Sequence, residues 1–133
     1  MVTIRTAVDA SAMIVMLIEE NDRGHLVSDR LSGSSCCAPE LLPFEVANVL
    51  RRKTIAGILP ERQAKRALNV LEEFPIELWP WKPLSSRIWR LRGSITAYDA
   101  SYIAVAELLG CPLLTGDARL SRAPGARCAV EVI

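Results

Sequence analysis

The sequence predicts an α/β domain with a central, mainly parallel sheet and helices on both of its faces. Short apolar stretches suited to buried strands alternate with longer segments of helical periodicity along the chain. Prolines and glycines fall between these segments, where they favour the starts and ends of helices. The length of 133 residues suits one domain, so we expect a single domain over residues 1–133.

Local signals set the expected elements in order. Pro43 suits the first position of a helix that continues to about Ala56, where Gly57 ends it. Pro60 likewise begins a helix that reaches Phe74. Strands are expected at residues 3–8, 35–38, 76–79, 113–115 and 129–133, and helices at residues 10–19, 26–31, 43–56, 60–74, 84–91 and 97–109.

The composition is that of an ordinary globular protein. Hydrophobic residues make up 50% and charged residues 23% of the chain, which indicates neither disorder nor a membrane protein. The longest apolar runs are too short to span a bilayer, and the N-terminus lacks the pattern of a signal peptide. We therefore expect a cytoplasmic protein.

The cysteines and the single histidine do not indicate a zinc site. Cys36 and Cys37 are adjacent, whereas Cys111 and Cys128 are isolated, so no C-x-x-C pair exists, and His25 is the one histidine. Adjacent cysteines in an apolar strand are expected to belong to the core.

The net charge is only +1, but the basic residues are clustered. Such clusters are equally consistent with solvated helix faces and with contacts to nucleic acid, so their meaning depends on other residues. The clusters are Arg51 to Lys53, Arg62 with Lys65 and Arg66, Arg87 with Arg90 and Arg92, and Arg119 with Arg122.

Four acidic residues occupy positions that a solvated helix face does not explain. Asp9 and Asp117 follow expected strands, and open α/β sheets place functional residues at such carboxyl ends, although capping of the next helix explains either one alone. Asp99 lies in the first turn of a helix that is apolar on nearly every side, so its carboxylate is expected to be poorly solvated. Glu45 lies in the first turn of the helix after the second strand, where the helix dipole also favours it.

These four carboxylates predict a metal site if they converge at one edge of the sheet. Their mutual repulsion would raise at least one carboxyl pKa, and a hard divalent cation with oxygen ligands, Mg²⁺ or Mn²⁺, would remove that repulsion. Such a cation can activate water and neutralise charge on a phosphodiester. The sequence has no His/Ser pair, P-loop or GxGxxG motif that supports another mechanism.

Four sequence blocks resemble the PIN domain, specifically the VapC toxins of bacterial toxin–antitoxin modules. Each block contains one of the four acids, and together they reach from end to end of the chain in the order and spacing of that family. The blocks are VDAS at residues 8–11, PFEVANVLRR at 43–52, TAYDASYIAVAELLG at 96–110 and LLTGDARL at 113–120.

The resemblance implies a fold, an activity and partners. The implied fold is a three-layer α/β/α domain with about five parallel strands and the acids at their C-terminal edge. The implied activity is that of an endoribonuclease that cleaves RNA, often structured RNA such as tRNA, with Mg²⁺ or Mn²⁺. Proteins of this kind are homodimers that a VapB-type antitoxin holds inactive.

The resemblance also implies roles for individual residues. Glu45 resembles the acid that orients water or completes the metal shell, and Thr115 resembles a polar residue that supports the site. Ser11 and Asn48 are weaker candidates for hydrogen bonds to these ligands. The residues that resemble metal-binding carboxylates are Asp9, Asp99 and Asp117.

Three other functions compete with this interpretation. A response-regulator receiver domain has paired acids after its first strand, whereas Ala7 and Val8 precede Asp9 here. A haloacid-dehalogenase-type phosphatase has an aspartate where this chain has Ser11. A PIN-like module that binds RNA without cutting it has the same fold, and loss of cleavage with retained binding would distinguish it.

The chain has more large apolar side chains than one small core is expected to hold. Trp79, Trp81 and Trp89 stand out, with Leu59 and Leu68. Core burial is the simpler expectation for each tryptophan. A two-fold homodimer interface is the alternative, because exposed apolar patches mark such surfaces.

Overall fold

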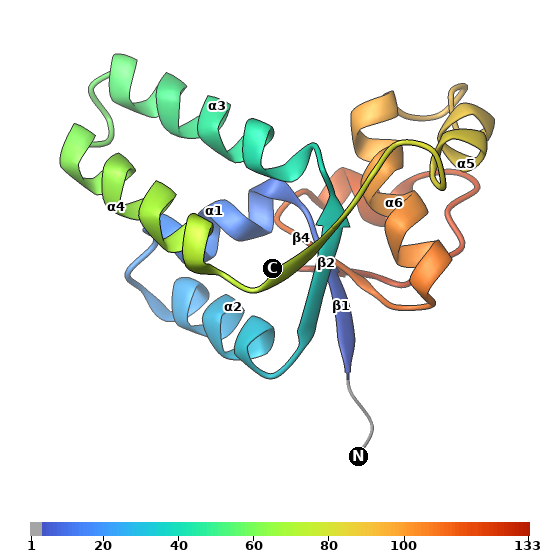
Figure 1. The fold of residues 1–133 in the computed structure, drawn as a ribbon, viewed down its shortest axis with the longest axis horizontal. Helices are drawn as coiled ribbons and strands as arrows, with labels where there is room; N and C mark the ends of the chain where they lie inside the picture. The colour runs from blue at the N-terminus through green and yellow to red at the C-terminus, as the bar shows by residue number, and fades with distance from the viewer. Residues whose placement is uncertain (1–3) are drawn as a thin grey trace.

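The computed structural model describes residues 4–133, which form a five-stranded, all-parallel sheet between two helical layers (Figure 1). The strand order is β3-β2-β1-β4-β5. The strands are β1 (Arg5–Val8), β2 (Ser35–Pro39), β3 (Ile76–Trp79), β4 (Leu113–Thr115) and β5 (Val130–Val132). The expected α/β class and three-layer arrangement are therefore confirmed.

The helices divide into two groups, one on each face of the sheet. The first group, which Figure 1 shows on the left, consists of α1 (Ala10–Ile18), α2 (Asp22–Ser32), α3 (Leu42–Ile55) and α4 (Glu61–Glu73). The second group consists of α5 (Ser85–Arg90) and α6 (Ala97–Leu109), with α6 packed on β1 and β2. A short 3₁₀ helix, η1 (Ala118–Arg122), follows β4.

The order of the strands explains this division and locates a crevice. Successive strands β1, β2 and β3 advance in one direction across the sheet, and their right-handed crossovers place α1 to α4 on one face. The chain then returns to the other side of β1 to form β4, so α5 and α6 lie on the opposite face. The direction reverses between β1 and β4, and ligands of open α/β sheets bind beyond the carboxyl ends of the strands at such a point.

The core lies between the sheet and both helical layers. Residues 100–106 of α6 are all buried, which confirms the expectation that this apolar helix lies in the interior. Cys36 and Cys37 are buried, as expected of core residues. Cys111 is also buried and Cys128 is partly buried, and all four are free thiols. Within residues 4–133, no helix combines the length and apolar character needed to cross a membrane.

Several element boundaries differ from the sequence prediction. The second helix begins at Asp22 and not at Leu26, because the side chain of Asn21 caps it by accepting a hydrogen bond from the N–H of Gly24 (2.9 Å). Pro60 is the residue before α4 and not its first helical position. Thr3, predicted to begin the first strand, lies outside the described residues.

The tryptophans do not all belong to the core. Trp81 is 62% exposed and Trp89 is 66% exposed, so the expectation of core burial is wrong for both. Trp79 is partly buried against the core, and its indole N–H is buried without a partner among the described residues. Leu59 is buried, whereas Leu68 is exposed. Apolar character alone therefore did not separate core residues from surface residues.

Candidate active site at the carboxyl ends of β1 and β4

Asp9 lies just beyond β1 and is only 5% exposed. Its Oδ1 accepts hydrogen bonds from the backbone N–H of Ala12 (2.9 Å) and from the hydroxyl of Ser11 (2.6 Å), and its Oδ2 accepts one from the hydroxyl of Thr115. The first of these bonds caps α1, so the capping role left open by the sequence is confirmed. The same carboxylate nevertheless lies buried at the point where the strand order reverses.

The loops that follow β1 and β4 are in direct contact beside Asp9. The hydroxyl of Ser11 accepts a hydrogen bond from the N–H of Gly116 (2.7 Å) and lies 3.3 Å from the hydroxyl of Thr115. A Cβ atom at Gly116 would lie 3.2 Å from the Ser11 oxygen, which is too close for a comfortable contact. Glycine at this position therefore allows the two loops to approach, and its N–H holds the hydroxyl of Ser11 in place.

Asp117 is held by Thr115 through its backbone and by Arg119 through its carboxylate. Its backbone N–H donates to the hydroxyl of Thr115 (2.9 Å), and its carboxylate caps η1 by accepting from the N–H of Arg119 (3.0 Å). The guanidinium of Arg119 also forms an ion pair with this carboxylate. That bond lowers the pKa of Asp117 below its ordinary value. The sequence placed Arg119 only in a basic cluster and missed its contact with an acid of the site.

The carboxyl groups of Asp9 and Asp99 both have raised pKa values. Burial is the largest cause for each, and the charge of Asp117 adds to it. Asp99 is half-buried in the first turn of α6, where the charge of Arg119 partly offsets the rise. The expected direction of the shift is confirmed, but desolvation contributes more than the mutual repulsion that the sequence suggested.

Tyr102 connects the remaining acid to this region. Its side chain is 2% exposed, and its hydroxyl donates a hydrogen bond to Oε1 of Glu45 (2.5 Å) in the first turn of α3. Burial, the bond to Glu45 and the charges of Asp9 and Asp99 all raise the pKa of Tyr102. Tyr102 therefore lies among three of the four acids. The sequence missed it because one phenol in an apolar helix is an ordinary core residue.

The carboxylates of Asp9, Glu45 and Asp117 each accept a hydrogen bond from a different group, whereas Asp99 donates its backbone N–H to the hydroxyl of Thr96. Within residues 4–133, no three acidic, histidine or cysteine side chains lie close enough together to hold one metal ion. The available donors are carboxylate and hydroxyl oxygens, which suit Mg²⁺ or Mn²⁺ and not a thiophilic metal. Asn48, the other polar candidate, is exposed on α3.

The chain is similar to known proteins along most of its length. The family model of the PIN domain matches residues 6–126. Ribonuclease VapC1 of Mycobacterium tuberculosis (strain ATCC 25618 / H37Rv) is 38% identical over 127 residues, which cover 95% of this chain and 96% of that protein. Ribonuclease VapC9 of the same strain is 36% identical with the same coverage.

Solved structures share the fold. PAE2754 from Pyrobaculum aerophilum is 28% identical, with a TM-score of 0.68 that covers 97% of this chain and 84% of that one. VapBC2 from Rickettsia felis, solved bound to a DNA fragment from its promoter, has a TM-score of 0.71 at 11% identity and covers 97% and 98% of the two chains. At that identity the likeness concerns the fold alone. The relatives and the family model together show that this chain belongs to the PIN-domain family, among the VapC proteins.

Proposed function

We propose that the protein is a divalent-cation-dependent endoribonuclease and the toxin of a toxin–antitoxin pair. The observation that carries this proposal is the buried carboxylate of Asp9, which lies where the strand order reverses between β1 and β4. The charge of Asp117 raises the pKa of both Asp9 and Asp99 there. The relatives named above are ribonucleases, which identifies RNA as the polymer to test.

A divalent cation fits the donors of this site. Because no three of these acids lie close enough together to bind one ion directly, Asp9, Asp99 and Asp117 would hold Mg²⁺ or Mn²⁺ partly through bound water, and Glu45 would complete its shell or orient water. When bound, the cation neutralises charge on the scissile phosphate and activates water. It would also offset the cost of ionising Asp9 and Asp99, whose pKa values burial raises.

The surrounding side chains act on the orientation and ionisation of these acids. The hydroxyls of Ser11 and Thr115 donate to Asp9, so they favour its ionised form and fix both of its oxygens. The phenol of Tyr102 fixes one oxygen of Glu45. Partners of this kind matter because a displacement of an acid by even 1 Å can cost a large share of the rate, on the order of 100-fold.

The partner we propose is a VapB-type antitoxin. The structure named above from Rickettsia felis is a VapBC pair, and a free ribonuclease in the cytoplasm would harm its own cell. A basic side chain of the antitoxin would pair with Asp9 or Asp117, in the way that Arg119 already pairs with Asp117. Antitoxin and cation would then compete, and each would weaken the binding of the other by the same factor.

Cleavage by the purified chain tests the proposal. The protein, free of any antitoxin, would be incubated with total bacterial RNA in Mg²⁺, in Mn²⁺ and in EDTA. We expect internal cleavage in both metals and none in EDTA, because the acids alone lack an electrophile. Cleavage that survives EDTA would rule out the metal site. RNA that is bound but stays intact in both metals would identify the non-catalytic binding module instead.

A further inference from the structure

An open groove of about 610 Å³ adjoins the candidate site. It lies between the segment from Arg92 to Thr96, the first turn of α6, and η1. Asp99 and Arg119 line this groove and also belong to the acidic site, so the two are continuous. A polymer whose scissile bond lies at the acids would therefore extend into the groove.

The charge of the groove is opposite to that of the acidic site. Arg92, Arg119 and Arg122 line it, and Asp99 is the one acid among its lining residues. The N-terminus of α6, at Thr96, adds the positive end of a helix dipole. An anionic strand that the carboxylates repel in the absence of a cation is thus attracted immediately beside them.

Arg92 lines the groove, and its guanidinium stacks on the ring of Trp89 next to it. The guanidinium of Arg92 lies 4.8 Å from the centre of the Trp89 ring and donates to the Trp89 carbonyl (2.8 Å). This single bond leaves most of the guanidinium N–H groups available to a phosphate. Although Arg92 covers part of the ring, 66% of Trp89 is exposed. An exposed aromatic ring beside an arginine is suited to stacking an unpaired base.

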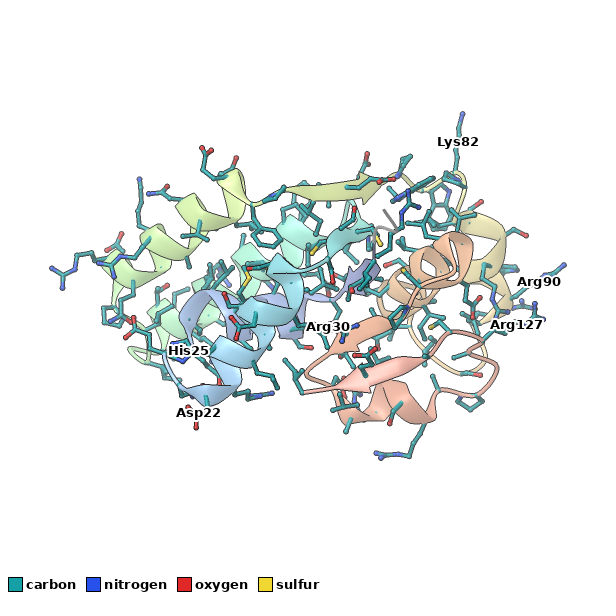
Figure 2. The ribbon with its side chains drawn as sticks, turned by 90° about the horizontal axis from the view of Figure 1, so that it is seen from below. Asp22, His25, Arg30, Lys82, Arg90 and Arg127 are labelled. Carbon is teal, nitrogen blue, oxygen red and sulfur yellow. The ribbon has the colours of Figure 1, made fainter. Side chains whose placement is uncertain are left out.

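The other arginines of the same cluster have different environments. Arg87 is committed to the fold, because it pairs with Glu107 and donates to the carbonyl of Gly125. Arg90 points outward from α5 in Figure 2, and it does not line the groove. The basic cluster that the sequence could not interpret therefore contains a structural residue, a solvated residue and a residue of the groove.

We infer that this groove binds the single-stranded RNA segment next to the scissile bond, with Arg92 and Arg122 contacting its phosphates and Trp89 stacking one of its bases. The inference rests on the proposed ribonuclease function and identifies the form of its substrate. A base can reach Trp89 only when it is unstacked from its neighbours, so the site selects a loop or an end over a continuous duplex.

Binding of a fluorescein-labelled single-stranded RNA, measured by anisotropy in EDTA between about 50 and 200 mM salt, tests the inference. For Arg92→Gln we expect weaker binding and a smaller salt dependence, with the slope of log Kd against log salt lower by about 0.7 per lost phosphate contact. For Trp89→Ala we expect at least about fivefold weaker binding with the wild-type slope, and Trp89→Phe should restore most of it. Arg90→Gln, on the same helix, should bind as the wild type does.

Three results would overturn the inference while leaving the ribonuclease proposal intact. In the first, the wild type cleaves and binds RNA, and both Arg92→Gln and Trp89→Ala bind it with the affinity and salt slope of the wild type. The second is equal or tighter binding of a blunt duplex of the same length. The third is a change of oligomeric state in Trp89→Ala, which would mean that a second copy of the chain covers this ring. Failure of the wild type to cleave RNA in Mg²⁺ or Mn²⁺ would instead reject the proposed function itself.

Discussion

Asp9 and Thr115 are 106 positions apart in the sequence, yet the hydroxyl of Thr115 donates a hydrogen bond directly to the Asp9 carboxylate. The hydroxyl oxygen of Thr115 also accepts a hydrogen bond from the backbone N–H of Asp117. One hydroxyl thus joins the end of β1 to the loop after β4, and it touches two of the proposed metal ligands.

Thr115→Val, which keeps the shape and removes the hydroxyl, should shift the pH dependence of cleavage. Loss of a hydrogen bond to the ionised form raises the pKa of Asp9 further above its ordinary value of 3.8, so the acid limb of the kcat/KM profile should move to higher pH. Stability should fall by about 1–3 kcal/mol at neutral pH.

The stability loss in Thr115→Val should also depend on pH. The raised pKa of Asp9 means that its ionisation opposes folding, a cost that is absent below 3.8 and complete above the pKa of the folded state. The loss measured by urea unfolding should therefore be smaller at acid pH. Thr54→Val, which removes a hydroxyl bonded only to the carbonyl of Arg51, is the matched control and should leave the profile in place.

Asp99→Asn should abolish cleavage without unfolding the protein. Burial already disfavours the charged form of Asp99, so a neutral side chain of the same shape should be tolerated at neutral pH. Removal of a metal-binding or proton-handling carboxylate should lower the cleavage rate by more than about 100-fold. Circular dichroism and urea unfolding would confirm the fold, and a wild-type rate would show that Asp99 is no part of the site.

Tyr102→Phe should reduce both stability and cleavage. The lost hydroxyl donates to a carboxylate, but Glu45 is only half-buried and can regain water, so we expect a loss of about 1–2 kcal/mol. Freed from its partner, Glu45 should support cleavage about 10- to 100-fold less well. Tyr98→Phe removes an exposed phenol from the same helix and serves as the control. Unchanged cleavage in Tyr102→Phe would mean that Glu45 needs no fixed orientation.

Arg119→Gln should tighten the binding of Mn²⁺. The guanidinium holds Asp117 in an ion pair, and a cation must compete with it for the same oxygens. Without Arg119 the pKa of Asp117 would rise toward 3.8, which still leaves this carboxylate ionised at neutral pH. Isothermal titration at pH 7 would measure the change, with Arg90→Gln as the control. Weaker binding of Mn²⁺ would show that Arg119 orients Asp117 for the cation.

The protein should be a dimer in solution. Trp81 and Tyr98 are each 62% exposed and line an apolar groove with Leu84 and Ile88, a surface that suits a second copy. Light scattering at tens of micromolar, an ordinary assay range, should give twice the chain mass, and Trp81→Ala should favour the monomer. A monomeric wild type at that concentration would contradict the prediction.

The sequence predicted the acids from their places relative to strands and helices, and those places depend on local signals. Asp9 and Asp117 follow strands, and Glu45 and Asp99 lie in first helical turns. Parallel strands bring their carboxyl ends to one edge, so these positions could be inferred without knowledge of side-chain contacts.

The partners of the acids could not be predicted in this way. The contacts of Tyr102 with Glu45 and of Arg119 with Asp117 could not be predicted, because they depend on which side chain lies nearby in the fold and not on spacing within one helix. The start of α2 was missed because its first turn is polar, although Asn21 carried a capping signal. Trp89 was expected in the core because apolar character does not tell a packed ring from one left exposed.

The bond between Asp9 and Thr115 also sets the time at which the site can form during protein synthesis. Asp9 leaves the ribosome with β1, whereas Thr115 is made after β2 and β3 are complete. At about 5–20 residues per second, the 106 positions between them take on the order of 5–20 s to translate. A nascent chain therefore cannot complete this site until β4 has joined the sheet.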